Sequence, residues 1–376
     1  MQPKWILILL ISLVVVCIAI VLVVFSLNSR NLSPDEAQKQ LIDCNSLQFG
    51  GEGGKNIVFF SNEETSKQYA DYLLNQEPYS SNKNKLNFYY IDSNDYTPVC
   101  ETYKGIAILC YSKELIKKAS SCPIDLIVVL KNEAVEMRSS SYMNVMSLNI
   151  NSPKTVFLHE LGHALASLAD EYIPSKIPSS SKNCQKSCES YQGLNEGCFQ
   201  GCSNEDYSRS IENGIMRTLQ TKSYGKFNEA LILEKLTGES SGKLTGLATK
   251  NPVDCSKQEY VLIDGSYNSE NNEKIEINSK TIETGCLGTN GAGSFEYKLN
   301  LQSGESLTDE FNPELIFTDS QETGNNNING AALDYQGNFF LKIPIVENAK
   351  SLEIIKDKQI LIELNLEDVT ARPCKI

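Results

Sequence analysis

The two histidines of the chain, His159 and His163, lie four residues apart in one short segment that also contains Glu160. On a helix, this spacing places both imidazoles on one face, one turn apart, where both can bind the same metal ion. Glu160 would project beside them, where it can take a proton from a metal-activated water. The segment His-Glu-Leu-Gly-His matches the HExxH pattern of zinc hydrolases and predicts a metallopeptidase. The alternative is a surface helix with two incidental histidines.

The rest of this helix is predicted to be buried. Pro153 can open it, because proline is tolerated in the first turn. A buried helix also needs an apolar face at helical spacing. The residues that supply it are Val156, Phe157, Leu161, Ala164, Leu165 and Leu168.

A catalytic zinc site needs three protein ligands and an open position for water. Since the chain has no further histidine, Asp170 and Glu171 are the nearest candidates for the third ligand. A straight helix would carry Asp170 about 10 Å beyond His163 along its axis, which no carboxylate can span. The helix is therefore predicted to break shortly after Ala166 or Leu168 and turn back. A glutamate from a second element, Glu205, is a further alternative.

A methionine about fifty residues downstream supports this geometry. The segment Asn-Gly-Ile-Met-Arg, which contains Met216, looks like the Met-turn of the metzincins, a tight turn that places a methionine beneath the metal. An ordinary core methionine is the alternative interpretation.

These motifs together resemble one family. The stretch His-Glu-Leu-Gly-His-x6-Asp-Glu-Tyr, followed by a cysteine-bearing insert and Ile-Met-Arg, is similar to the IgA-peptidase family of zinc metallopeptidases over roughly residues 55–240. The resemblance implies a metzincin-like catalytic domain with His159, His163 and Asp170 as zinc ligands and Glu160 as the base. It also implies an accessory β-sandwich. Where other metzincins have a helix-breaking glycine, this chain has Ala166.

The expected activity is hydrolysis of peptide bonds in a protein or peptide substrate, with one zinc ion as cofactor. Zinc lowers the pKa of its water, and Glu160 takes the proton and later delivers it to the leaving amine. Tyr172 and Tyr224 are candidates for a second oxyanion donor. Two other functions stay open: a catalytically silent cell-surface binding protein, and a zinc hydrolase of another amide such as a peptidoglycan cross-link.

Residues 5–27 form an apolar run without a charged residue, long enough to cross a bilayer as a helix. The exit of this run is a poor cleavage site, which favours an uncleaved signal anchor within residues 1–30 over a secreted form. The formal net charge of −13 argues against a nucleic-acid partner.

Cysteine usage indicates an oxidising, extracytoplasmic compartment for the catalytic body. Cys184, Cys188, Cys198 and Cys202 form two CxxxC pairs, which predict a helical hairpin at residues 183–203 held by Cys184–Cys202 and Cys188–Cys198 bridges. A structural four-thiolate zinc site is the alternative. Another predicted bridge joins Cys255 to Cys286. Cys44 or Cys100 could instead cap the zinc as a switch thiol, although pairing is favoured for both.

The predicted fold class is α+β. A stalk at residues 31–54 leads to a peptidase domain at 55–245, where alternating strand and helix patterns indicate a mixed sheet with the active-site helix packed against it. Residues 136–149 are predicted to form the sheet edge beside the cleft, either an ordinary edge or one that holds an extended peptide. From residue 250 to 376, short strands indicate an all-β sandwich. Polar clusters, among them 318–330, are predicted as its turns, and no catalytic constellation is found in it.

Overall fold

The computed structural model describes residues 41–193, 196–238, 254–268, 274–321 and 328–366. They form a mixed α+β structure made mainly of strands, in agreement with the predicted class. None of the helices within these ranges is both long and apolar enough to cross a bilayer. The predicted membrane anchor within residues 1–30 lies outside the described residues.

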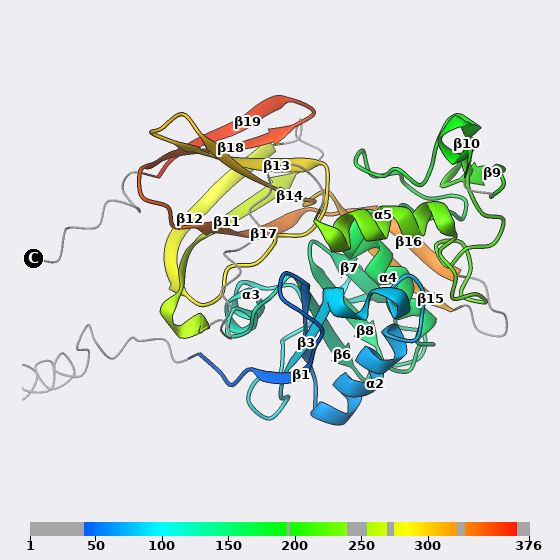
Figure 1. Ribbon diagram of the computed structural model, residues 1–376, viewed down its shortest axis with the longest axis horizontal. Helices are drawn as coiled ribbons and strands as arrows, with labels where there is room; N and C mark the ends of the chain where they lie inside the picture. The colour runs from blue at the N-terminus through cyan, green and yellow to red at the C-terminus, as the bar shows by residue number, and fades with distance from the viewer. Residues whose placement is uncertain (1–40, 194–195, 239–253, 269–273, 322–327, 367–376) are drawn as a thin grey trace, which may run out of the picture. The chain divides into compact units, whose positions relative to one another are not determined.

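The largest element is an eight-stranded mixed sheet, in the order β1-β3-β2-β6-β8-β7-β15-β16 (Figure 1). Its four central strands are parallel, and the other four are antiparallel to their neighbours. The runs 57–60 and 126–129 are fully buried, as expected for parallel strands covered on both faces. The strands are β1 (Asn45–Phe49), β2 (Lys55–Phe60), β3 (Leu86–Ile91), β6 (Leu126–Lys131), β7 (Ser139–Tyr142), β8 (Val145–Asn149), β15 (Leu315–Gln321) and β16 (Ile328–Asp334).

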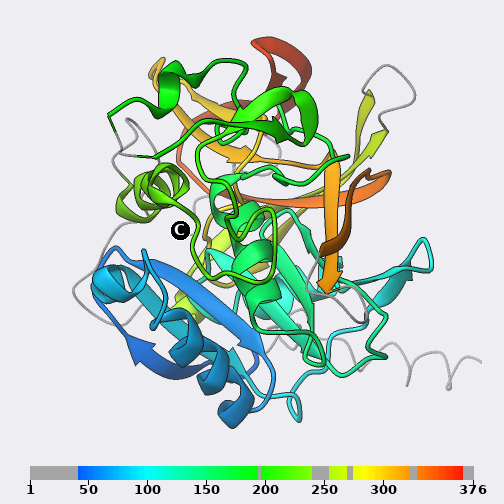
Figure 2. The same cartoon turned by 90° about the vertical axis from the view of Figure 1, so that its right-hand side faces the viewer.

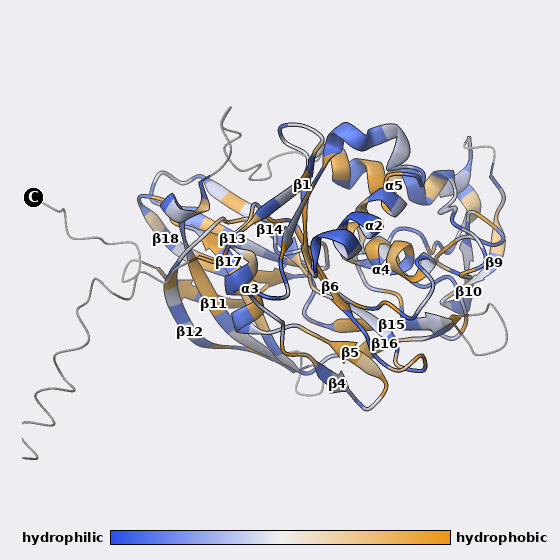
Figure 3. Ribbon diagram, turned by 90° about the horizontal axis from the view of Figure 1, so that it is seen from below, coloured by the Kyte–Doolittle hydropathy of each residue, from blue (hydrophilic) through white to orange (hydrophobic). Residues whose placement is uncertain are grey.

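Three helices cover one face of this sheet and a fourth covers the other. Helices α2 (Glu63–Leu73), α4 (Thr155–Ala166) and α5 (Lys226–Thr237) share a core with the first face. Helix α3 (Lys113–Ala119) packs on the opposite face, together with residues of the C-terminal strands. Figure 3 shows α4 largely hydrophobic and α2 largely hydrophilic, which fits the complete burial of α4. A separate two-stranded ribbon is formed by β4 (Glu101–Tyr103) and β5 (Ala107–Leu109), and β5 contacts β7 and β8.

The C-terminal region forms the predicted β-sandwich. A three-stranded sheet, β12-β11-β17, packs on a four-stranded sheet, β14-β13-β18-β19, around one apolar core. The short strands predicted for residues 250–376 are present. The strands are β11 (Glu259–Asn268), β12 (Lys274–Thr284), β13 (Phe295–Leu301), β14 (Ser306–Phe311), β17 (Gly337–Pro344), β18 (Ala349–Lys356) and β19 (Gln359–Asn365).

Two strand pairings cross the predicted domain boundaries. The described residues between 41 and 366 belong to one compact unit. Strand β1, from the predicted stalk, pairs with β3, and β15 from the predicted accessory region pairs with β7 (Figure 2). The prediction of turns at 318–330 was therefore wrong at its two ends. Thr318, Asp319 and Ser320 are polar but buried in the strand β15, whose neighbour β7 is also polar and buried, so hydrophobicity did not indicate a strand here.

Among the described residues, five disulfides join ten cysteines, a number typical of extracellular proteins. The predicted pairs Cys184–Cys202, Cys188–Cys198 and Cys255–Cys286 are confirmed. The predicted helical hairpin is wrong, since this insert contains a 3-10 turn, Cys188–Tyr191, and a β-ribbon of β9 (Phe199–Cys202) and β10 (Asn204–Arg209). Gly201 has a positive φ of 87° within β9, a conformation that suits a tight ribbon and not a helix. The remaining pairs are Cys44–Cys122 and Cys100–Cys110.

Lys342 is a buried lysine on β17, and its titration tests how the C-terminal strands pack against the rest of the structure. Burial lowers the pKa of Lys342 to about 7, although Asp125 and Asp309 oppose the shift. Its ammonium nitrogen donates to the carbonyl of Leu287 at 2.8 Å. Between pH 7 and the higher pKa of the unfolded chain, the unfolded state binds more protons, so stability rises with pH. We expect Lys342→Met to remove a slope of about 1.4 kcal/mol per pH unit.

The measurement is urea unfolding at several pH values between 7.5 and 9.5. The exposed Lys350→Met variant is the control, and it should keep the parental slope. An unchanged slope in Lys342→Met would show that this lysine is charged in the fold.

Candidate metal centre

Helix α4 ends where the ligand argument requires it to end. Its C-terminal residue is Ala166, and Ser167 follows in the left-handed conformation with φ 51° and ψ 33°. The Ser167 N–H donates to the carbonyl of His163 at 3.0 Å, and the Leu168 N–H donates to that of Gly162 at 3.2 Å. These bonds close the last turn and reverse the chain. The predicted break after Ala166 is confirmed, one residue beyond the position of the expected glycine.

The left-handed conformation of Ser167 leads to a prediction about stability. A non-glycine residue pays about 1–2 kcal/mol for this conformation, which glycine avoids at a smaller cost in chain entropy. The Ser167 hydroxyl oxygen is buried without a hydrogen-bond partner. Ser167→Ala therefore isolates the loss of the hydroxyl. We expect Ser167→Gly to be more stable than Ser167→Ala by about 1 kcal/mol, which thermal unfolding would measure as a rise of roughly 2 °C. Equal stability would mean that the turn carries no strain.

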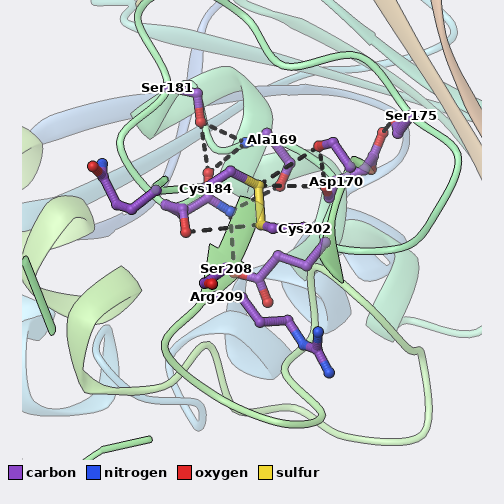
Figure 4. The surroundings of a disulfide bond; sticks show 12 residues. Ala169, Asp170, Ser175, Ser181, Cys184, Cys202, Ser208 and Arg209 are labelled. Atoms are coloured by element: carbon purple, nitrogen blue, oxygen red, sulfur yellow. Dashed lines mark hydrogen bonds between the residues drawn. A yellow bond between two sulfur atoms is a disulfide. The ribbon is translucent and has the colours of Figure 1, made fainter. Parts of the chain in front are cut away.

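The disulfide-bonded insert holds the segment after the helix (Figure 4). The side chain of Asn183 accepts from the Ala169 N–H at 2.8 Å and donates to the Ala169 carbonyl at 2.9 Å. The Ser203 hydroxyl donates to the carbonyl of Asp170 at 2.6 Å, and that of Ser175 donates to Asp170 Oδ2 at 2.8 Å. Asp170 Oδ1 is thereby left to face the histidines. The insert thus acts as a support for the third candidate ligand.

The predicted Met-turn lies directly beneath the helix. Residues 214–217 form a tight turn, in which the Arg217 N–H donates to the Gly214 carbonyl at 2.9 Å. Met216 is fully buried, and its carbonyl accepts from the Glu171 N–H at 2.7 Å. A Cβ atom on Gly162, between the two histidines, would lie 2.7 Å from the Met216 sulfur. Glycine at 162 therefore allows the methionine to approach the helix backbone.

Four buried side chains bring one potential ligand atom each to the same place: His159, His163, Asp170 and Asp319, all within 4.8 Å of one another. The two Nε2 atoms are 3.1 Å apart. Asp170 Oδ1 lies 3.1 Å from Nε2 of His159 and 3.3 Å from that of His163. Asp319 Oδ2 lies 3.3 Å and 3.9 Å from the same atoms. Four ligands around zinc at about 2.0–2.2 Å lie roughly 3.4 Å apart, so the spacing fits a metal ion of this size.

The hydrogen bonds of the imidazoles also fit a metal. Nδ1 of His159 is 2.9 Å from the Ile215 carbonyl, and Nδ1 of His163 is 2.6 Å from that of Leu168. A carbonyl can only accept, so each Nδ1 carries the proton, and when the rings are neutral each presents an Nε2 lone pair. Two lone pairs that face each other at 3.1 Å cannot form a hydrogen bond. A cation between them satisfies both, and backbone carbonyls commonly orient metal-binding histidines in this way.

The charges around the group also favour a bound cation. Asp170, Asp319 and Glu160 are all completely buried. Burial raises the pKa of Glu160 well above its usual range, and the Asp319 carboxylate adds to the shift. Burial opposes protonation of His159, but Asp319 and Asp170 raise its pKa overall. A buried cluster of carboxylates is costly unless it is paired with a positive charge.

Asp319 is the one member of the group that sequence reasoning missed. It lies on β15, 156 residues after His163, in the region predicted to contain no catalytic constellation. The only local sign of a special role is that Asp319 is a charged residue within 315–321, a run that otherwise has the pattern of a strand. Register with β7 and contact with α4 bring it to the centre. Only the tertiary pairing makes this visible.

The structure separates the other candidates. Glu171 points away from the group, because its carboxylate accepts from Asn183 and Asn228 at 3.1 Å and 2.8 Å. Burial raises the pKa of Glu171 to about 7. Glu205 is exposed on β10 and does not belong to the group.

The two tyrosines proposed as oxyanion donors occupy different places. The Tyr172 hydroxyl donates to Asp319 Oδ1 at 2.8 Å, so it lies at the centre. The Tyr224 hydroxyl donates to the Leu158 carbonyl, and its ring contacts Gly162 beside Met216. Tyr224 therefore supports the helix from below. Both candidate switch thiols, Cys44 and Cys100, are disulfide-bonded.

No protein-family model matches the chain, and no curated protein matches its sequence. The assignment of a function to the centre therefore depends on its geometry and chemistry.

Proposed function

We propose that the protein is a zinc-dependent endopeptidase of metzincin type, anchored to the membrane by its N-terminal segment with the described body outside the cell. His159, His163 and Asp170 would hold the zinc, and Glu160 would act as the base. The resemblance of these residues to the IgA-peptidase family motif supports this function, as do the five disulfides.

The observation that carries the proposal is the pair of imidazoles with facing Nε2 atoms, 3.1 Å apart, beside Asp170 and Glu160. Nδ1 of each ring is already occupied by a carbonyl. Metal binding by two histidines and one acid from a single helix and the turn after it is the arrangement that the HExxH motif predicts. Met216 beneath the helix adds the second element of a metzincin site.

The chain supplies the proton transfers and the positioning. A zinc ion bound here would polarise a peptide carbonyl and lower the pKa of an attacking water. Glu160 follows His159 directly and accepts the proton of that water at its carboxylate, then donates it to the leaving amine. Tyr172 can donate a hydrogen bond toward the developing oxyanion.

A second candidate is a catalytically silent protein in which the metal only stabilises the fold. Asp319 favours it, because four protein ligands are typical of structural zinc sites and leave no position for water. The cavity beside His163 is only about 10 Å³, room for about one water molecule.

Metal content and peptide cleavage test the proposal together. The purified full-length chain should contain one zinc ion per molecule. A mixed peptide library is then incubated with the parent and with an Asp319→Asn variant, because Asp319 fills part of the centre. We expect cleavage by at least one of the two forms, abolished by a chelator and restored by zinc. Zinc at one equivalent without cleavage in either form would favour the silent protein, and a metal-free chain would contradict both functions.

A further inference from the structure

Resting on the peptidase proposal, we propose that strand β15 occupies the substrate cleft and that Asp319 is a fourth metal ligand, so that the described conformation is a latent form. The proposal combines two features of β15 that arise independently. One is its pairing with the edge of the sheet, and the other is the placement of its side chains at the metal centre.

The backbone of β15 lies where an extended peptide would add to the sheet. Strand β7 is the last strand contributed by the N-terminal half of the chain, beyond β8 in the sheet order. Strand β15 pairs with it antiparallel through Phe317, Thr318 and Asp319, which lie opposite Ser141, Ser140 and Ser139. Without β15, β7 would be an open edge beside α4. Open edges of this kind bind extended peptides as an added strand.

The side chains of β15 complete the closure. Phe317 and Asp319 are two residues apart and so point to the same face of the strand. The Phe317 ring stacks on His163, with ring centroids 3.8 Å apart and an interplanar angle of 11°. Asp319 Oδ2 lies 3.3 Å from His159 Nε2 and accepts no hydrogen bond. This carboxylate oxygen is buried, has no hydrogen-bond donor and faces two imidazole nitrogens. These are the properties expected of an oxygen that binds a metal ion.

The other oxygen of Asp319 is held in place. Tyr172 donates to Oδ1 at 2.8 Å, which leaves Oδ2 as the single ligand atom. Gly330 lies opposite Asp319 on β16. A Cβ atom at this glycine would lie 1.7 Å from Asp319 Oδ1 and 2.5 Å from the Tyr172 hydroxyl. The absence of a side chain at 330 is therefore a condition for this arrangement of Asp319 and Tyr172.

This arrangement explains two properties of the centre. Glu160 is completely buried, although a catalytic base must meet water and substrate. The ligand set contains four protein groups, although a catalytic zinc keeps one position open. Withdrawal of β15 from β7 would expose Glu160, free the fourth position and open the edge strand in one movement. The chain's own strand thus takes the place that the substrate takes in the active form.

Cobalt in place of zinc gives a readout that does not depend on activity. The full-length chain is loaded with Co²⁺, and its visible absorption spectrum is recorded with and without acetohydroxamate, a small chelating ligand. We expect no spectral response in the parent. Asp319→Asn keeps the size of the side chain and an acceptor for Tyr172 but is a poor ligand. It should retain one equivalent of cobalt, bind it at least tenfold more weakly, and respond to acetohydroxamate.

Gly330→Ala is a second variant that alters no ligand. Its methyl group should displace the Asp319 carboxylate and produce the same response. Asp334→Asn, on the same pair of strands and exposed, is the matched control and should behave as the parent does. Thermal unfolding of each loaded variant shows whether it is folded.

The outcomes distinguish this inference from the peptidase proposal. A parent whose cobalt spectrum responds to acetohydroxamate as strongly as that of Asp319→Asn would overturn the fourth ligand, even if it cleaves peptides. If Asp319→Asn and Gly330→Ala respond while the parent does not, the fourth ligand and the closed centre are supported. Should those open forms then cleave no peptide, the peptidase proposal alone would fail.

Discussion

Replacement of Asp170 with alanine is expected to weaken zinc binding by about two to three orders of magnitude. Structural zinc sites bind with roughly 10–16 kcal/mol, so one of four ligands accounts for about 3–4 kcal/mol. Asp170 is completely buried, and burial opposes its ionisation, but His163 and His159 lower its pKa below the usual value. Its carboxylate is thus ionised and directed at the imidazoles. Competition with a chromophoric chelator measures the affinity.

The two rival glutamates are the controls for this prediction. Glu205→Ala should bind zinc as the parent does, since Glu205 is exposed on β10. Glu171→Gln should keep the hydrogen bonds that Asn183 and Asn228 donate and lose little affinity. A large loss in either variant, with Asp170→Ala close to the parent, would mean that the third ligand has been assigned to the wrong carboxylate.

The second large effect concerns turnover. We expect Glu160→Gln to retain one equivalent of zinc and to lower kcat by about 10²–10⁴, because an amide cannot accept the proton of the attacking water. Glu160 contributes no atom to the group of four ligand atoms, so the metal should stay bound. The assay is peptide cleavage in the Asp319→Asn background, where position 319 no longer supplies a carboxylate as fourth ligand.

The Glu160→Gln variant could lose activity either because it loses zinc or because it lacks the base, and its metal content distinguishes these two causes. Zinc bound at the parental stoichiometry together with lost cleavage identifies Glu160 as the base. Glu133→Gln is the matched control, since Glu133 belongs to no ligand group and should leave cleavage unchanged. Parental turnover in Glu160→Gln would exclude this glutamate from the proton transfers.

The local part of the candidate metal centre could be predicted from the sequence. His159 and His163 share a helical face because their spacing is close to one turn, and no tertiary contact can change that. Helix geometry predicted only that the helix breaks after Ala166 or Leu168, and the break at Ser167 agrees with this. The same geometry left Asp170, Glu171 and Glu205 open as third ligand, and the resemblance to the IgA-peptidase family favoured Asp170. The turn around Met216 was predicted from its likeness to a Met-turn, and the structure has a tight turn there.

The cysteine pattern determined the pairing of the insert but not its shape. Each CxxxC pair fits a helical turn, yet the segment forms the β-ribbon β9-β10 with a 3-10 turn. Nested bridges such as Cys184–Cys202 and Cys188–Cys198 restrain either hairpin equally well. The choice follows from contacts outside the insert, such as the bonds from Asn183 and Ser203 to the backbone of Ala169 and Asp170.

The position of β15 beside the candidate metal centre was decided by tertiary structure alone. Strand β15 is polar where it meets β7, so hydrophobic alternation, which marks a half-buried strand, is weak in both partners. Asp319 looks like a residue of a surface turn until the register with Ser139 places it beside His159. Residue spacing within one helix fixes which atoms can share a metal, because helix geometry is local. Whether a distant strand then covers that metal depends on long-range pairing between segments of the chain, which no local pattern encodes.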